Sequence, residues 1–181
     1  MSNVRARNMN HLIAAVERSL QTGNHYAALA MALTLPDICG WILNPNVGSK
    51  VRYISWFEKY LQPQYTRPAS LRMAEHVFLT GADCYALRCA YLHEGRDDIT
   101  DQHAQQVLES FQFVVPPQGW LVHRNQMNNT LQLQLDVFCR EVTEAVAAFL
   151  AEITLNQAAT LRLGQLLLIR DINGQPLQVG P

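Results

Sequence analysis

The segment from 137 to 153 carries an apolar stripe at helical spacing, and this stripe most constrains what the chain can fold into. Apolar side chains recur there every three or four residues, so they line one face of a helix. They are Val137, Phe138, Val142, Val146, Phe149 and Leu150. An amphipathic helix of this length must cover its apolar face, because apolar surface left in water costs free energy. The chain therefore has to supply other elements that pack on it.

Further segments with the same periodicity predict those packing partners. The expected helices are 9–20, 25–35, 51–61, 71–79, 82–93 and a segment from Thr100 or Asp101 to Leu108 or Ser110. Pro36 either interrupts the second of these or lies within a nearly continuous helix that reaches residue 41. Gly23 and Gly95 are placed to end helices, and Thr80 is placed to cap one.

The helical period gives way to short β-like segments in the C-terminal half. Segments 111–115, 120–123 and 131–135 are separated by turn-forming residues and predict a small antiparallel meander. Segments 166–169 and 176–179 flank Asn173-Gly174, which is typical of a hairpin turn. The expected fold is mainly α, a helical bundle with a small antiparallel β meander or hairpin in the C-terminal half, forming one domain over 1–181.

Charge and cysteine usage exclude several classes of protein. The formal net charge is −1, so the chain lacks the basic excess of a general polyanion binder. Its four cysteines are scattered and its six histidines dispersed, which predicts reduced thiols, no zinc site and no cofactor. The first ten residues contain no apolar run of the signal-peptide type, and no window looks long and apolar enough to span a membrane. A cytoplasmic location without membrane contact is expected.

The most informative stretch is Leu87-Arg88-Cys89-Ala90-Tyr91-Leu92-His93-Glu94-Gly95, late in a predicted helix. Its Arg-x-x-x-x-His pair, Arg88 and His93, resembles the signature of the HEPN superfamily. The resemblance covers this motif and the surrounding helices. It implies a metal-independent ribonuclease of the toxin type, with a composite site across a homodimer, RNA as substrate and a cognate antitoxin or inhibitor as a further partner. The family often has a polar residue after the arginine, where this chain has Cys89.

The two residue types suit cleavage of a phosphodiester. Histidine titrates near neutral pH, so His93 can exchange a proton with a ribose hydroxyl or a leaving oxygen. Arg88 can stabilise the charge that builds on the phosphorane. The expected supporting or substrate-binding residues are Asp83, Tyr85, Cys89, Tyr91 and Arg96.

Helix geometry adds a condition to this site. Residues five apart on a helix point about 140° away from one another, so Arg88 and His93 serve one phosphate only if the last turn loosens or a second subunit completes the site. In a purely structural reading, Arg88 pairs with Asp83 or Glu94 and His93 caps the helix end.

Two other functions compete with the ribonuclease. The same motif helix can serve as the dimer face of a noncatalytic interaction protein. Glu141 and Glu144 form a Glu-x-x-Glu that resembles the metal-binding tetrad of MazG-type nucleotide pyrophosphohydrolases. In that family a Glu-x-x-Asp follows, whereas here the only such tetrad, 94–97, precedes it.

Overall fold

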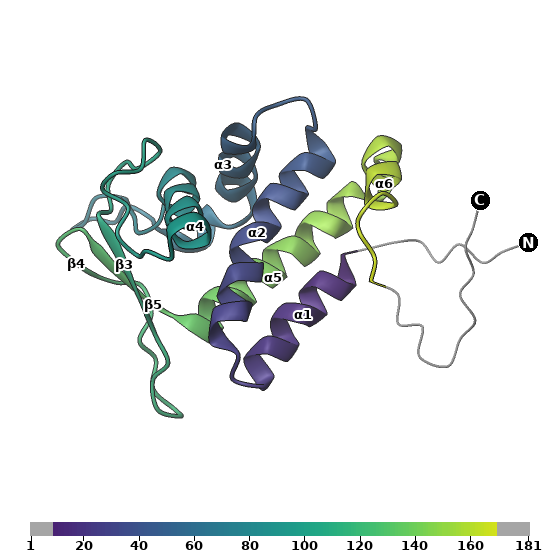
Figure 1. Cartoon of the computed structure of the whole chain (residues 1–181). Helices are drawn as coiled ribbons and strands as arrows, with labels where there is room; N and C mark the ends of the chain where they lie inside the picture. Colours follow the sequence, from purple (N-terminus) through teal and green to yellow (C-terminus); the bar gives the residue numbers. More distant parts are fainter. Residues whose placement is uncertain (1–8, 170–181) are drawn as a thin grey trace, which may run out of the picture.

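The structure is a computed structural model and describes residues 9–169. Within that range it is mainly α-helical, with small sheets at one end of the helices (Figure 1). The helices are α1 (Asn10–Gln21), α2 (His25–Leu43), α3 (Ser49–Tyr60), α4 (Gly81–Glu94), α5 (Leu135–Glu152) and α6 (Gln157–Leu163). Single 3₁₀ turns, η1 (Gln62–Tyr65) and η2 (Ile153–Leu155), follow α3 and α5.

Helix α2 is the central helix of the fold. It packs against α1, α3 and α5, and its buried side chains join one apolar core with those helices. It runs through Pro36 without a break, which confirms the continuous alternative. Proline removes one helical hydrogen bond, and burial of residues on both sides of Pro36 offsets that loss.

By length and composition α2 is also apolar enough to cross a membrane, which corrects the expectation that no segment is. One or two such helices are weak evidence of a membrane span, since the core helix of a folded domain passes the same test. Half of the 18-residue apolar stretch of α2 is buried inside the molecule. Asp37 within it pairs with Arg52 of α3.

Gly40 marks the closest approach of α2 and α3. A Cβ placed there would lie 2.7 Å from the carbonyl oxygen of Arg52 and 2.9 Å from its carbonyl carbon. Both atoms belong to backbone, so relief requires the two helices to separate.

Replacing Gly40 by alanine is therefore expected to destabilise the protein by about 1–3 kcal/mol, the usual cost of overpacking. In an open helix position the same substitution instead stabilises a protein by up to about 1 kcal/mol, because alanine has the higher helix propensity. Gly48→Ala is the control, because nothing lies within 4 Å of a Cβ at Gly48. Urea unfolding of the three proteins checks the prediction, and a Gly40→Ala variant as stable as Gly48→Ala would contradict it.

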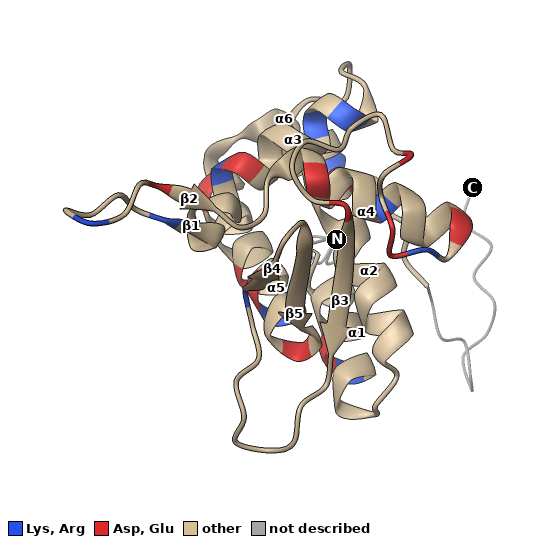
Figure 2. Ribbon diagram, turned by 90° about the vertical axis from the view of Figure 1, so that its left-hand side faces the viewer, with Lys and Arg blue, Asp and Glu red and all other residues tan. Residues whose placement is uncertain are grey.

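The main sheet has the strand order β3-β5-β4, from β3 (Ser110–Val114), β5 (Thr130–Gln134) and β4 (Asn125–Met127). β4 and β5 form an antiparallel pair, but β3 runs parallel to β5, so the expected all-antiparallel meander is wrong in that respect. Segment 120–123 is not a strand. The chain instead makes a long excursion after β3 and returns through β4, which allows the parallel pairing (Figure 2).

Two predicted helices do not form. Segment 71–79 contributes β2 (His76–Val77), paired with β1 (Thr66–Arg67) in a short hairpin. Leu71, at the start of this segment, is fully exposed, so the apolar pattern that predicts the helix is not matched by burial. Segment 100–110 is a series of turns leading into β3. Of the predicted 166–179 hairpin, 166–169 is irregular and the remainder lies outside the described residues.

Candidate functional site

Helix α4 carries the Arg88/His93 motif, and its N-terminus is fixed by a buried carboxylate. Thr80 caps the helix by accepting a 3.0 Å hydrogen bond from the Asp83 N–H, as its sequence position predicts. The Asp83 side chain is fully buried. Its Oδ1 accepts hydrogen bonds from the backbone N–H groups of Gln106 (2.7 Å) and Val107 (3.2 Å). Asp83 therefore ties the loop before β3 to α4 and is out of reach of a substrate.

Arg88 belongs to a partly buried cluster formed by three helices. Its Nη2 lies 3.6 Å from Oδ2 of Asp37 on α2, rather than near Asp83 or Glu94. Asp37 also accepts from Arg52 Nε at 2.6 Å and from Ser49 Oγ at 3.0 Å. The Nε of Arg88 is buried and has no hydrogen-bond partner among the described residues. Two guanidinium groups thus share one carboxylate, which leaves the cluster with a net positive charge.

His93 is exposed, and its imidazole makes no hydrogen bond or ion pair with the described residues, so it does not cap the helix end. Gly95 ends α4 instead, with φ +70°, and the N–H groups of Gly95 and Arg96 bond back to Tyr91 and Ala90. Helix α4 is regular to Glu94. Because no turn is loosened, the motif residues diverge by about 140° within one chain.

A stripe of half-buried side chains lies between the two motif residues on α4. Helical spacing places Tyr85, Cys89 and Leu92 in the arc between Arg88 and His93, and each of them is partly accessible. The Tyr85 ring packs edge-on against Tyr53, 5.4 Å between centroids. Burial, together with neighbouring Cys89, raises the pKa of Tyr85, so its hydroxyl stays neutral.

Tyr91 and Arg96 lie apart from this stripe. They line a separate pocket of about 320 Å³ with Tyr26, and the Tyr91 hydroxyl donates to the backbone oxygen of Tyr26. Arg96 pairs with Glu94, Asp98 and Asp101. Acidic positions are frequent in the segment that follows α4 (Figure 2).

A second polar cluster, buried between α5 and the loop before β4, is centred on Glu141. Its Oε2 accepts hydrogen bonds from the Tyr65 hydroxyl (2.5 Å) and His123 Nε2 (3.2 Å), and its Oε1 accepts from Arg124. His123 Nδ1 accepts from the Gln134 N–H, so Nε2 carries the proton that His123 shares with Glu141. Every oxygen of the buried carboxylate is therefore satisfied.

Burial raises the pKa of Glu141, but the bonds from His123 and Tyr65 and the charge of Arg124 outweigh it and lower the pKa below its ordinary value. The carboxylate is thus ionised at neutral pH. Arg124 adopts φ +59°, a conformation unfavourable for a residue with a side chain. Its ion pair with Glu141 and its position over the Tyr65 ring, 5.0 Å from the centroid, hold it there.

These contacts argue against a metal site at Glu141 and Glu144. Both Glu141 oxygens face hydrogen-bond donors, one of them a guanidinium, and Glu144 is exposed. No group of three His, Cys, Asp or Glu residues in the described part of the chain is placed to hold a metal ion. The sequence pattern does not single out Tyr65, His123 or Arg124 as site residues. The sequence feature that points to this polar cluster is Glu141, a charged residue within the apolar segment 137–153.

Comparisons of the chain with protein-family models, curated proteins and solved structures give no match.

Proposed function

We propose that the protein is a HEPN-like, metal-independent ribonuclease whose active site forms between two copies of the chain. The observation that carries this proposal is the Arg88 cluster. Arg52 and Arg88 share the single carboxylate of Asp37, so a net positive charge remains for an anion, and the Arg88 side chain is 19% exposed. Such fixed donors stabilise a phosphorane without reorganising.

The divergence of Arg88 and His93 supports a composite site. A second copy of α4 packed across the stripe of Tyr85, Cys89 and Leu92 would set the His93 of one protomer beside the Arg88 of the other. One His93 would remove the 2′-hydroxyl proton as the 2′ oxygen bonds to phosphorus. Water would donate a proton to the 5′ oxygen as the bond between that oxygen and phosphorus breaks. The products are a 2′,3′-cyclic phosphate and a 5′-hydroxyl.

The test is cleavage of labelled single-stranded RNAs in excess EDTA. Arg88→Ala and His93→Ala are each expected to lower the rate by about 100-fold or more, because each removes a group that acts in the transition state. Arg18→Ala and His103→Ala are the matched controls, since Arg18 and His103 are exposed. Circular dichroism verifies that all four variants fold. A wild-type protein inert on varied RNAs, or activity that EDTA abolishes, would overturn the proposal.

A noncatalytic dimeric interaction protein is the second candidate, and a specific observation favours it. Asp37 already pairs with Arg88, and four acidic residues follow His93 within eight positions of the sequence, where their negative charge disfavours a polyanion. They are Glu94, Asp97, Asp98 and Asp101. For this function the chain would dimerise without cleaving RNA. Light scattering on the wild type and on Leu92→Asp distinguishes these two functions. A wild-type dimer that Leu92→Asp dissociates, together with no nuclease activity, would select the interaction protein.

A further inference from the structure

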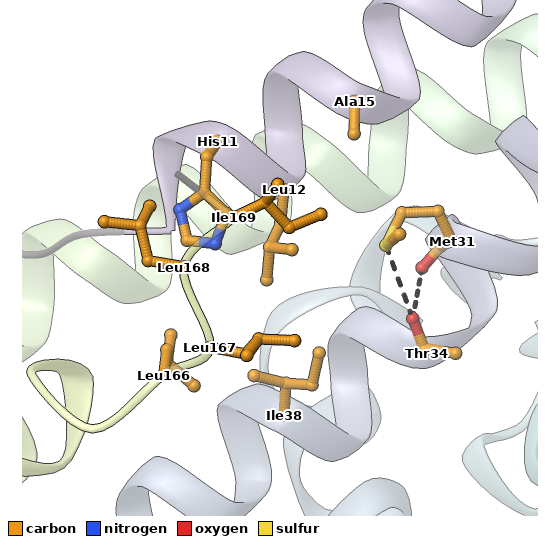
Figure 3. Close-up of a pocket in the computed structure, with 10 residues that line it drawn as sticks. All are labelled: His11, Leu12, Ala15, Met31, Thr34, Ile38, Leu166, Leu167, Leu168 and Ile169. Carbon is orange, nitrogen blue, oxygen red and sulfur yellow. Dashed lines mark hydrogen bonds between the residues drawn. The ribbon is translucent and has the colours of Figure 1, made fainter. Parts of the chain in front are cut away.

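A pocket of about 650 Å³ lies at the opposite part of the molecule from the sheet, between α1, α2 and the segment that follows α6 (Figure 3). That segment, 166–169, returns towards the start of α1 and forms the outer wall. The volume lies within the range of small-molecule sites. The pocket shares no residue with the Arg88 cluster.

The lining is apolar almost throughout. The residues that line the pocket are His11, Leu12, Ala15, Met31, Thr34, Ile38 and 166–169. Only His11 and Thr34 have polar side chains, and the Thr34 hydroxyl already donates to the Met31 carbonyl at 2.7 Å. Apolar contact would therefore favour binding of a ligand in this pocket. Burial of a strongly hydrated group there would cost binding free energy.

Small and flexible side chains shape the pocket into a slot. Figure 3 shows His11 and Leu168 at one end, and Met31 and Thr34 at the other. Ala15 and Thr34 leave room between α1 and α2, and the unbranched side chain of Met31 can adapt to what enters. An elongated aliphatic chain fits this arrangement better than a compact polar molecule.

The outer wall offers a route of entry. Leu167 and Ile169 remain 84% and 89% exposed although they line the pocket. Segment 167–169 belongs to no helix or strand. An irregular wall with exposed side chains opens at little cost, and a bound chain would cover apolar side chains that now face water.

We propose that this slot binds a small molecule with a single aliphatic chain, of the fatty-acid class. The chain lies between α1 and α2 under 166–169, and its polar head stays at the mouth. This site is separate from the proposed ribonuclease site, and its test does not depend on that activity.

The test is calorimetric titration of the full chain with octanoate, decanoate and dodecanoate below their micellar concentrations. The expected result is one site per chain, with affinity rising about threefold to fourfold per added methylene because each is buried. Ala15→Leu, which fills the slot, is expected to weaken dodecanoate binding at least tenfold. Ala14→Leu makes the same change at the exposed neighbouring position and should bind like wild type. An affinity that does not change with chain length, or that is equal in the two variants, would overturn the proposal.

Three further measurements distinguish other occupants. Leu167→Asp places a charge in the exposed outer wall, so it should fold and should weaken binding even if Ala15→Leu proves unstable. Phosphatidylcholine vesicles should not sediment the protein; sedimentation lost in Ala15→Leu would assign the slot to a membrane and refute a small-molecule site. Light scattering should give wild type and Ala15→Leu the same mass, and a lower mass for Ala15→Leu would assign the slot to a second copy.

Discussion

Replacing Glu141 by glutamine is expected to lower the free energy of unfolding by about 3 kcal/mol, the low end of the cost of breaking a buried ion pair. Arg124 would keep its charge without a partner, and Tyr65 and His123 would face a group that accepts fewer hydrogen bonds. The low end applies because the Arg124 side chain is one-third exposed and water screens part of its charge. Urea unfolding at pH 7 measures the effect.

Glu144→Gln is the matched control for this substitution. Glu144 lies three residues further along α5 and is exposed, so the same change there should alter stability by no more than about 0.5 kcal/mol. The pH dependence gives a second check. Because the pKa of Glu141 lies below its ordinary value of 4.5, its stabilisation is complete above that value and is lost as the pH falls through the lower folded-state pKa. The gap between wild type and Glu141→Gln should therefore narrow only below about pH 4.5. Equal stability of the Glu141 and Glu144 variants would refute the structural role of this cluster.

Mixing inactive Arg88→Ala and His93→Ala proteins should restore RNA cleavage to about one quarter of the wild-type rate, if the proposed composite site is correct. Helix α4 is regular from Gly81 to Glu94, so the two motif residues of one chain cannot converge on one phosphate. Random exchange places one protomer of each kind in half of the dimers. Each such dimer has one site with an intact Arg88 and an intact partner His93.

The measurement is cleavage after the two variants are unfolded and refolded together, compared with each variant refolded alone. Mixing Arg88→Ala with the double variant Arg88→Ala/His93→Ala is the control, because no site in that mixture contains Arg88. If the wild type cleaves RNA, a mixture as inactive as the control would place both residues of a site in one chain and would exclude the composite geometry. Single variants that stay active would show that cleavage does not require Arg88 or His93.

The sequence predicts individual helices well where one face is apolar throughout. The stripe of 137–153 corresponds to α5, and Thr80 and Gly95 bound α4 as their residue types predict. Prediction fails where local preference and burial disagree: 71–79 has helix-forming residues, but Leu71 finds nothing to pack on. The parallel pairing of β3 with β5 depends on a long connection, which no local pattern encodes.

For the candidate site too, some features follow from the sequence and others only from tertiary packing. The sequence by itself determined that Arg88 and His93 lie five residues apart on one helix, and hence that they diverge. Only the tertiary structure decided that Arg88 meets Asp37 and Arg52, that Asp83 is buried in a loop contact, and that Glu141 binds Tyr65, His123 and Arg124. The physical reason is that helical periodicity is set by neighbours within four residues, whereas a buried charge is satisfied by whichever donors the packed helices bring to it.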